Sequence, residues 1–373
     1  MTQIIPVIKA QIKTMCYHRG FEPKGYYYAK KIANGYWGLL AFSYATYSAC
    51  CSIDVSIGVF NETIHKYSKK IWAGSDSKAL FWLILPNIGW LDEKKPHRAV
   101  WDINDMSDIS KVCNNIFDKV DTLSPWFFST YSNIDILIRT YENYRSQPWP
   151  LCHDDAYRVL PLLYLVNNQK DIGLEYLLKY LCRQEIITQY DMPYIEKYDS
   201  QFGEPILKDI HIGDLFSVIT ESGDKRFFQF VSKDASQFNS DVIRIFKRAY
   251  SREENPVTND IINDELDSYM HTMVSWGLYL GMWTRYDTDC NIGRMDISFR
   301  RSKDYGRFPL FEKRVSTNWE VWTINQPKQD VGILPKEYYS ADIGDIGSPS
   351  MVLKRISEGY FPSPWYPLFA NDY

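Results

Sequence analysis

The chain has 373 residues, of which 45% are hydrophobic and 24% charged, and this size and composition are typical of a globular protein with two domains. Its formal net charge of −4 argues against nucleic acid as a partner, because phosphate binding needs a basic surface. The longest apolar stretch, residues 79–86, is too short to cross a membrane. Residues 1–200 sum to about +1 and residues 201–373 to about −5, so the C-terminal half is the better match for a basic partner. The alternative is that this charge forms an ordinary solvated face.

The seven cysteines do not form a disulfide or metal-binding pattern. Their number is odd, and no Cys-x-x-Cys pair occurs. Free buried thiols in a reducing compartment are the simplest interpretation. The N-terminus also lacks the basic region, long apolar run and small-residue cleavage site of a secretory signal. We therefore predict a cytoplasmic protein without a metal ion or cofactor, and the sequence specifies no oligomeric state.

The N-terminal half combines patterns typical of helices with patterns typical of strands. Apolar residues recur at helical spacing over residues 4–17, and Gly20 provides a C-cap. Asn34-Gly35 predicts a hairpin, and residues 52–59 alternate between polar and apolar as a half-buried strand does. The other predicted strands cover residues 25–32, 36–43, 79–85 and 99–103, and the other predicted helices cover residues 107–123, 134–144, 154–167 and 171–182. This order predicts an α+β fold in which helices accompany an antiparallel sheet.

Residues 5–145 resemble a family of small bacterial domains of unknown function. The shared features are the leading helix, the turn that contains Gly20-Phe21 and Lys24-Gly25, the strand with Gly58-Val59, and Trp101 before a long helix that ends near Pro125. Members of that family often accompany toxin–immunity loci, so the resemblance implies a role in such a system.

Residues 184–206 are predicted to link two domains. This stretch is polar, contains Pro193, Gly203 and Pro205, and shows no sustained period. The predicted domains are therefore residues 1–183 and residues 207–373. The helices of residues 107–182 belong either to the first domain or to a small helical unit of their own.

The C-terminal half is predicted to be rich in β-structure. Residues 215–220 and 226–231 flank a turn in which Gly223 is free to adopt a positive φ. Residues 259–282 carry apolar side chains at three- and four-residue steps and predict the clearest helix of the chain. The remaining predicted strands cover residues 241–246, 296–300, 319–324 and 341–346, and a last helix covers residues 349–357. We expect a curved antiparallel sheet or partial barrel with two helices against it.

Over residues 210–360, this half resembles the immunity protein 26 family of bacterial polymorphic-toxin systems. The residues that carry the resemblance are Gly213-Asp214 before the first strand, Phe227-Phe228-Gln229-Phe230 on the second, and the stretches 239–246 and 316–322. The resemblance implies a protein that binds a cognate toxin stoichiometrically and neutralises it. It implies no catalytic site, so we predict that the chain is not an enzyme.

An acidic run is the strongest candidate for contact with such a toxin. Carboxylates that follow one another on a surface attract a basic partner and accelerate its association. The alternative is a solvated face whose charges are favourable at a helix N-terminus. The candidate residues are Glu253, Glu254, Asp260, Asp264, Glu265 and Asp267.

The C-terminal tail supplies a second candidate contact. Residues 360–369 are rich in aromatic side chains and prolines, so they cannot form a helix and must pack on something. Trp365 and Tyr366 are candidate toxin contacts. The alternative is that the tail packs on its own domain.

His153-Asp154-Asp155 is the one dense cluster of histidine and carboxylates. A hydrolase uses such a cluster as a general base or a metal site, whereas a helix N-terminus uses Asp154 or Asp155 as a cap. A third possibility for the whole chain is a module that binds a small ligand or peptide in a curved sheet. No nucleophile elbow, P-loop or dinucleotide motif occurs, so toxin binding is the preferred prediction.

Overall fold

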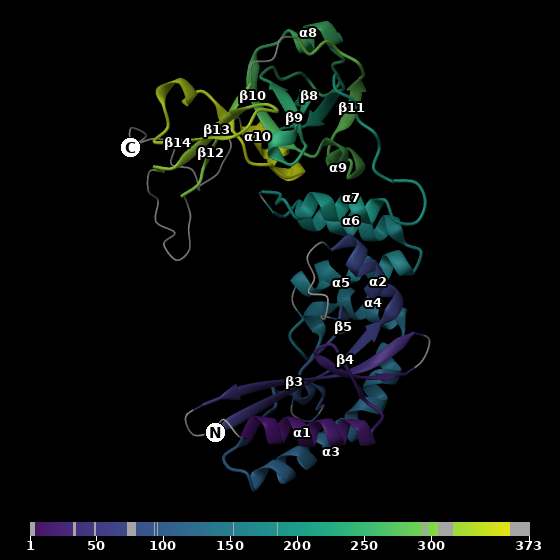
Figure 1. Ribbon diagram of the computed structural model, residues 1–373. Helices are drawn as coiled ribbons and strands as arrows, with labels where there is room; N and C mark the ends of the chain where they lie inside the picture. The colour runs from purple at the N-terminus through teal and green to yellow at the C-terminus, as the bar shows by residue number, and fades with distance from the viewer. Residues whose placement is uncertain are drawn as a thin grey trace. The chain divides into compact units, whose positions relative to one another are not determined.

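The computed structural model describes most of the chain, and it has the predicted α+β fold (Figure 1). The described residues are 4–32, 35–47, 50–72, 80–92, 94, 96–151, 153–184, 186–293, 297–304 and 316–358, without the side chains of residues 153 and 154. The chain divides into two compact units, Met1–Tyr176 and Leu177–Tyr373. The division falls within helix α6 (Lys170–Leu181).

The first unit contains a six-stranded sheet in the order β1-β2-β3-β4-β5, in which β6 also pairs with β4, and every pairing is antiparallel. Its strands are β1 (Glu22–Lys24), β2 (Tyr27–Lys31), β3 (Tyr36–Thr46), β4 (Cys51–Asn61), β5 (Trp82–Ile84) and β6 (Val100–Ile103). Its helices are α1 (Ile4–His18), α2 (Glu62–Ile71), α3 (Asp108–Tyr131), α4 (Ile134–Glu142) and α5 (His153–Val166).

Helix α3 packs against one face of the β3–β4 hairpin. Phe42 on β3 lies 6.1 Å from Phe117 on α3, measured between ring centroids. Further along the helix, the ring of Phe128 lies directly over Gly38, where a Cβ atom would come within 2.6 Å of it. Glycine is therefore needed at position 38, because any side chain would separate the helix from the sheet. Helix α1 lies beside α3 and buries its own apolar stripe (Figure 1).

The opposite face of this sheet is covered by a second apolar cluster. Ala29, Leu39 and Phe60 are buried there, and Trp82 packs against them. The guanidinium group of Arg158 on α5 lies 3.9 Å from the centroid of the Trp82 ring. Because both faces are covered, β4 is buried along nearly its whole length and is not the half-buried strand that its sequence alternation predicts.

Most predicted elements of the first unit are confirmed, but helix α2 and the short strand β1 were not predicted, and β3 and α3 extend beyond their predicted ends. Helix α2 was not predicted, although Asn61 caps it by accepting hydrogen bonds from the amides of Thr63 and Ile64 at 3.0 and 3.1 Å. Helix α3 continues through Pro125 to Tyr131, beyond the predicted end at residue 123. The Asn34 position of the predicted hairpin lies outside the described residues, and Gly35 has a φ of 79°.

The second unit contains a five-stranded antiparallel sheet, β10-β9-β8-β7-β11, and a four-stranded mixed sheet, β14-β13-β12-β15, in which β12 and β15 are parallel. The strands of the first are β7 (Leu215–Ile219), β8 (Lys225–Asp234), β9 (Ser240–Phe246), β10 (Leu266–Thr272) and β11 (Thr284–Asp287). Those of the second are β12 (Ser298–Ser302), β13 (Trp319–Thr323), β14 (Gln329–Gly332) and β15 (Asp342–Ile343). The helices after α6 are α7 (Asp191–Asp199), α8 (Thr258–Ile262), α9 (Val274–Tyr279) and α10 (Pro349–Glu358).

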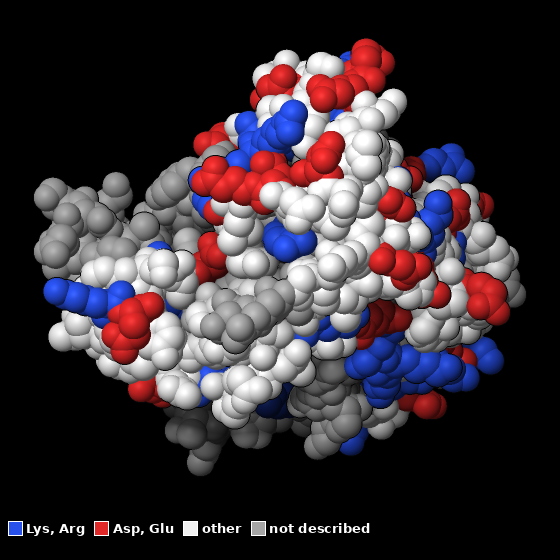
Figure 2. Space-filling view, turned by 90° about the horizontal axis from the view of Figure 1, so that it is seen from above, with Lys and Arg blue, Asp and Glu red and all other residues white. Residues whose placement is uncertain are grey.

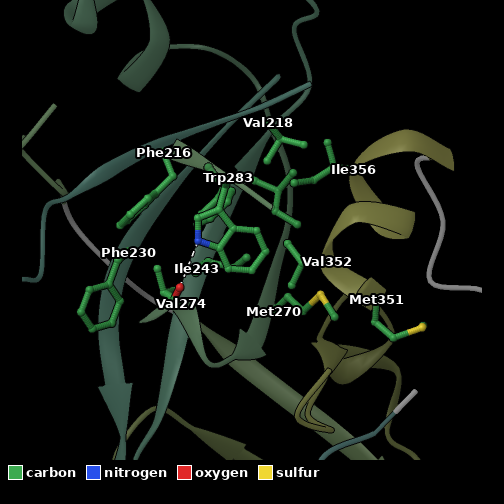
Figure 3. Packing of buried hydrophobic residues seen from close by; sticks show 12 residues of the cluster. Phe216, Val218, Phe230, Ile243, Met270, Val274, Trp283, Met351, Val352 and Ile356 are labelled. Atoms are coloured by element: carbon green, nitrogen blue, oxygen red, sulfur yellow. Dashed lines mark hydrogen bonds between the residues drawn. The ribbon is translucent and has the colours of Figure 1, made fainter. Parts of the chain in front are cut away.

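The main core of this unit surrounds Trp283 (Figure 3). The indole Nε1 of Trp283 donates a hydrogen bond to the carbonyl of Val274 at 3.0 Å. Phe228 meets the indole edge to face, and Val352 on α10 belongs to the same cluster. A Cβ atom on Gly277 would lie 2.1 Å from the indole, so this helix position also requires glycine.

The opposite face of the five-stranded sheet carries a smaller cluster that includes Leu215, Phe227 and Tyr250. A third cluster, with Val242, Phe299 and Trp322, contains residues of both sheets. The alternative prediction was a small-ligand or peptide site in the cup of a curved sheet. These side chains fill the sheet faces where such a site would lie. The described strands form no closed barrel.

The predicted helix over residues 259–282 is wrong. The structure has the short helix α8, then strand β10, then the short helix α9. Strand β10 pairs with β9 from Leu266 to Thr272, so tertiary pairing overrides the helical spacing of the apolar residues. The other predicted strands of this unit are present, although β15 covers only Asp342–Ile343 of the predicted stretch 341–346.

The segment predicted as a linker, residues 184–206, is also packed structure. Helix α7 buries Tyr194, Ile195 and Tyr198. Pro193 lies in its first turn, where a backbone amide has no intrahelical acceptor, so the missing N–H of proline costs no hydrogen bond. Before the helix, the amide of Ile187 donates to the carbonyl of Ile346 at 2.8 Å. Among the helices that the structure describes, none combines the length and apolarity needed to cross a bilayer.

Candidate functional site

The connection between β9 and β10, residues 247–265, is called the acidic loop below. Tyr250 is 4% exposed and Ile261 is fully buried, so the loop has its own apolar anchor. The ring of Phe227 on β8 meets Tyr250 edge to face at 5.4 Å and Tyr286 on β11 at 4.9 Å between centroids. The loop is therefore fixed to the five-stranded sheet by packing.

Hydrogen bonds fix the backbone of the acidic loop at several further points. The ammonium group of Lys225 donates to the carbonyl of Glu254 at 2.6 Å, and the amides of Lys225 and Tyr250 each donate to the other residue's carbonyl at 2.9 Å. The hydroxyl of Tyr286 donates to the carbonyl of Pro256 at 2.7 Å, and the hydroxyl of Thr258 donates to Asp287. Glu253 and Glu254 therefore sit on an ordered backbone.

The six predicted acidic residues fall into two groups. Glu253, Glu254, Asp260 and Glu265 are exposed, whereas Asp264 and Asp267 are partly buried. Acidic side chains gather on the face seen in Figure 2, with basic ones interspersed. Of the six, only Asp260 lies in a helix. The alternative that these charges stabilise a helix N-terminus therefore does not apply to Asp264, Glu265 and Asp267.

Three of the six carboxylates are used within the unit. Asp264 accepts hydrogen bonds from the amides of Arg248 and Glu265, both at 2.8 Å. Asp267 pairs with Arg355 on α10 at 3.3 Å, and Glu265 pairs with Lys247. These contacts shape the acidic loop and the edge of β10.

The other three carboxylates are turned to solvent. Glu254 accepts one local hydrogen bond, from the amide of Ser251 at 3.3 Å. The side chains of Glu253 and Asp260 make no hydrogen bond or ion pair with any residue that the structure describes. Between them in sequence lies Val257, whose side chain is 67% exposed. This residue was not predicted as a candidate contact, because one valine beside a proline forms no sequence pattern.

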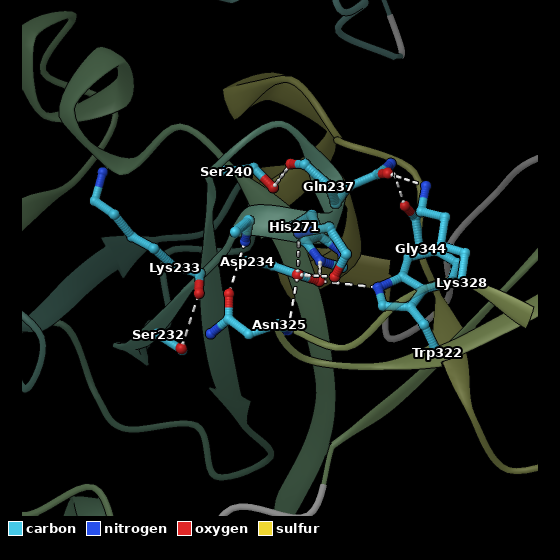
Figure 4. Close-up of polar contacts among 12 residues, drawn as sticks. Ser232, Lys233, Asp234, Gln237, Ser240, His271, Trp322, Asn325, Lys328 and Gly344 are labelled. Carbon is cyan, nitrogen blue, oxygen red and sulfur yellow. Dashed lines mark hydrogen bonds and ion pairs between the residues drawn. The ribbon is translucent and has the colours of Figure 1, made fainter.

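A second polar cluster, not predicted, lies buried between the two sheets and centres on Asp234 (Figure 4). Its Oδ2 accepts hydrogen bonds from Nε2 of His271 on β10 at 3.0 Å and from Nε1 of Trp322 on β13 at 2.9 Å. Its Oδ1 accepts hydrogen bonds from the amides of Ser236 and Asn325 at 2.9 and 3.0 Å. The carboxylate therefore joins β8 and β10 of one sheet to β13 of the other.

The protonation of this cluster follows from its geometry. Burial raises the pKa of Asp234, but the hydrogen bonds from His271, Ser236, Asn325 and Trp322 outweigh burial and hold the pKa well below its usual range. Burial lowers the pKa of His271 more than Asp234 raises it, so the imidazole is neutral and carries its proton on Nε2. Its Nδ1 is buried without a hydrogen-bond partner in the described structure.

This buried cluster has a structural role. Both Asp234 and His271 are fully buried, and the rings of Phe299 and Trp322 lie 4.0 and 6.1 Å from the imidazole centroid. Substrate has no access to side chains in this position. The cluster fixes the relative position of the two sheets that carry the exposed surface of the unit.

The remaining predicted sites lie partly or wholly outside the described residues. Trp365 and Tyr366 are outside them, as are the side chains of His153 and Asp154. Helix α5 begins at His153, so the His153-Asp154-Asp155 cluster occupies the first turn of a helix, where the capping alternative expects it. Among the described residues, no group of three or more His, Cys, Asp or Glu side chains is arranged to hold a metal ion.

Comparisons with known proteins gave no further guide. No protein-family model, no curated protein and no solved structure gives a significant match to this chain.

Proposed function

We propose that the chain is an immunity protein that neutralises a cognate bacterial toxin by stoichiometric binding through the acidic loop. The observation that carries this function is an ordered loop whose backbone is anchored at Tyr250, Lys225 and Ile261 while Glu253 and Asp260 remain free of partners within the described structure. An exposed carboxylate without an internal partner is available to a cation on another protein.

The anchoring matters because ordering a loop on binding costs free energy. A loop that is already fixed loses little conformational freedom when a partner arrives, so more of the contact energy appears as affinity. Val257, which lies between Glu253 and Asp260 in the sequence, adds an exposed apolar side chain to the acidic loop. A complete interface of this kind buries about 1,200–2,000 Å².

The toxin's matching surface is expected to be basic and to present an apolar recess for Val257. A basic cleft is typical of proteins that act on phosphate-rich substrates, so occupation by the acidic loop would block it. We place this action in the cytoplasm, where the free cysteines of the described chain would stay reduced.

Co-expression with the toxin encoded beside this protein tests the function. The wild type is expected to restore growth and to be recovered in a one-to-one complex with the toxin. The double variant Glu253→Lys with Asp260→Lys is expected to lose both. The matched control reverses two exposed carboxylates elsewhere in the unit, Glu337→Lys with Glu358→Lys, and is expected to protect like the wild type. Restored growth without any complex would contradict neutralisation by binding.

A further inference from the structure

The first unit contains a cavity of about 450 Å³ between the residues after α1, strand β2 and the C-terminal half of α3. Its size falls within the range of small-molecule sites, about 300–1,000 Å³. Its lining combines apolar side chains with charged ones. The cavity therefore suits a ligand that has an apolar part and a charged part. The toxin-binding surface proposed above belongs to the second unit, so this cavity is an independent feature.

The base of the cavity is aromatic. Phe21 and Phe128 are 3% and 7% exposed, and their ring centroids lie 6.1 Å apart. Pro125 and Ile32 add apolar surface beside them. Flat or branched apolar groups pack favourably against such a base, because aromatic rings contribute a large contact area.

The charge that lines the cavity is positive. Arg19 and Lys30 lie on the same side as one carboxylate, Asp121, which leaves an excess of one positive charge. Lys30 is paired with Gly38, which faces Phe128, so its side chain lies on the cavity side of β2, whereas that of Lys31 lies on the opposite face. Arg19 is already used, since its Nε and Nη2 donate to the two oxygens of Asp121 at 2.8 and 2.7 Å. The ammonium group of Lys30 forms no ion pair with the described residues. Lys30 lies over the base, with its Nζ 5.8 Å from the centroid of the Phe21 ring.

We infer that this cavity binds a small organic anion, a carboxylate on an aromatic or branched apolar body. The apolar body packs on Phe21 and Phe128, and the carboxylate pairs with Lys30. The Arg19–Asp121 pair is occupied in both states and forms one wall. A neutral ligand of the same shape fills the same space but leaves the Lys30 ammonium group without a partner, so the site prefers the anion.

Calorimetric titration of the full chain tests this preference. The probes are naphthalene-1-carboxylate and its neutral counterpart naphthalene-1-carboxamide. The carboxylate is expected to bind one-to-one, at least about fivefold more tightly than the amide, with a preference that weakens at high salt. The variant Lys30→Gln is expected to remove the preference and keep the weaker affinity for the amide, whereas Lys31→Gln, on the other face of the strand, is expected to keep the preference.

Two further variants locate the site. Lys9→Gln with Lys13→Gln removes two exposed lysines of α1 outside the cavity lining and is expected to leave the preference unchanged. Ser129→Trp places a large side chain at the cavity wall and is expected to abolish binding of both probes. Equal affinity for acid and amide, absence of binding, or equal losses in Lys30→Gln and in either lysine control would each overturn the inference.

Discussion

At the scale of single residues, Asp234 explains how a charge is tolerated in the interior of the second unit. A buried carboxylate is costly unless hydrogen bonds compensate it, and here donors from His271, Trp322, Ser236 and Asn325 surround it. Because those donors come from distant parts of the chain, the carboxylate holds two sheets together.

Asp234→Asn keeps the side-chain shape but turns one acceptor into a donor. The amide then faces two of the existing donors, so we expect the free energy of unfolding to fall by about 3–5 kcal/mol. Because the folded pKa of Asp234 lies below the unfolded value, wild-type stability should also decline as the pH falls below about 4, and the variant should show less of this decline. Denaturant titration at several pH values measures both effects. Asp289→Asn, at an exposed position, is the control, and equal stability of the two variants would contradict the role of Asp234.

Asp342 shows the opposite behaviour. Burial raises its pKa to about 6, although the amide of Tyr269 donates to the carboxylate at 2.9 Å. The folded state therefore holds the proton more tightly than the unfolded state, and this stabilisation is lost as the pH rises through about 6.

Asp342→Asn removes this titration and keeps an oxygen for the Tyr269 amide. We expect the variant to be more stable than the wild type by about 1–2 kcal/mol at pH 7.5 and nearly equal to it at pH 4. Unfolding by urea at the two pH values provides the comparison. The exposed Asp330→Asn on β14 should show no such gain, and a loss of stability in Asp342→Asn at pH 7.5 would refute the burial effect.

At the scale of elements, strand β10 shows what local sequence signals cannot decide. Leu266, Tyr269, Met270 and Met273 recur at helical spacing, yet β10 pairs with β9, and the Tyr269 amide is bonded to Asp342, which is 73 residues away. By contrast, β7 and β9 were predicted to within one residue at each end, and β8 was predicted without its last three residues. The prediction failed at β10 because apolar residues at three- and four-residue steps fit a helix locally, while pairing with β9 makes the segment a strand.

The same reasoning applies to the candidate sites. The acidic residues were visible because they are close in sequence, and the structure then separates those used internally, such as Asp264, from those that remain exposed, such as Glu253. The Asp234 cluster was invisible, because His271 and Trp322 lie 37 and 88 residues away from it. Only the folded sheets bring these residues together.

Helix α9 depends on one close contact that can be tested. Gly277→Ala would place a methyl group against the Trp283 indole, so we expect a loss of about 1–3 kcal/mol in the free energy of unfolding and weaker order around Trp283. Denaturant unfolding monitored by tryptophan fluorescence measures both. Ser275→Ala, two residues earlier on the same helix, should change stability little. Equal effects of the two substitutions would show that the close packing is not required.

At the scale of the whole molecule, the chain is two compact units with different surface chemistry. The first has a cationic cavity on an aromatic base, and the second has an ordered acidic loop on a sheet whose faces are filled. We therefore propose that the second unit binds a basic toxin and that the first binds a small anion. This division explains why reversing charges in one unit should leave binding by the other unchanged.

The dissociation constant of the purified complex with the cognate toxin, measured at about 50 and 200 mM salt, tests the central claim most directly. For the wild type, we expect affinity to fall as salt rises, mainly through slower association. Glu253→Lys with Asp260→Lys should weaken binding at least about tenfold at low salt and reduce the salt dependence, while Glu337→Lys with Glu358→Lys should bind like the wild type. Unchanged affinity of the Glu253 and Asp260 variant at both salt concentrations would contradict toxin binding through the acidic loop.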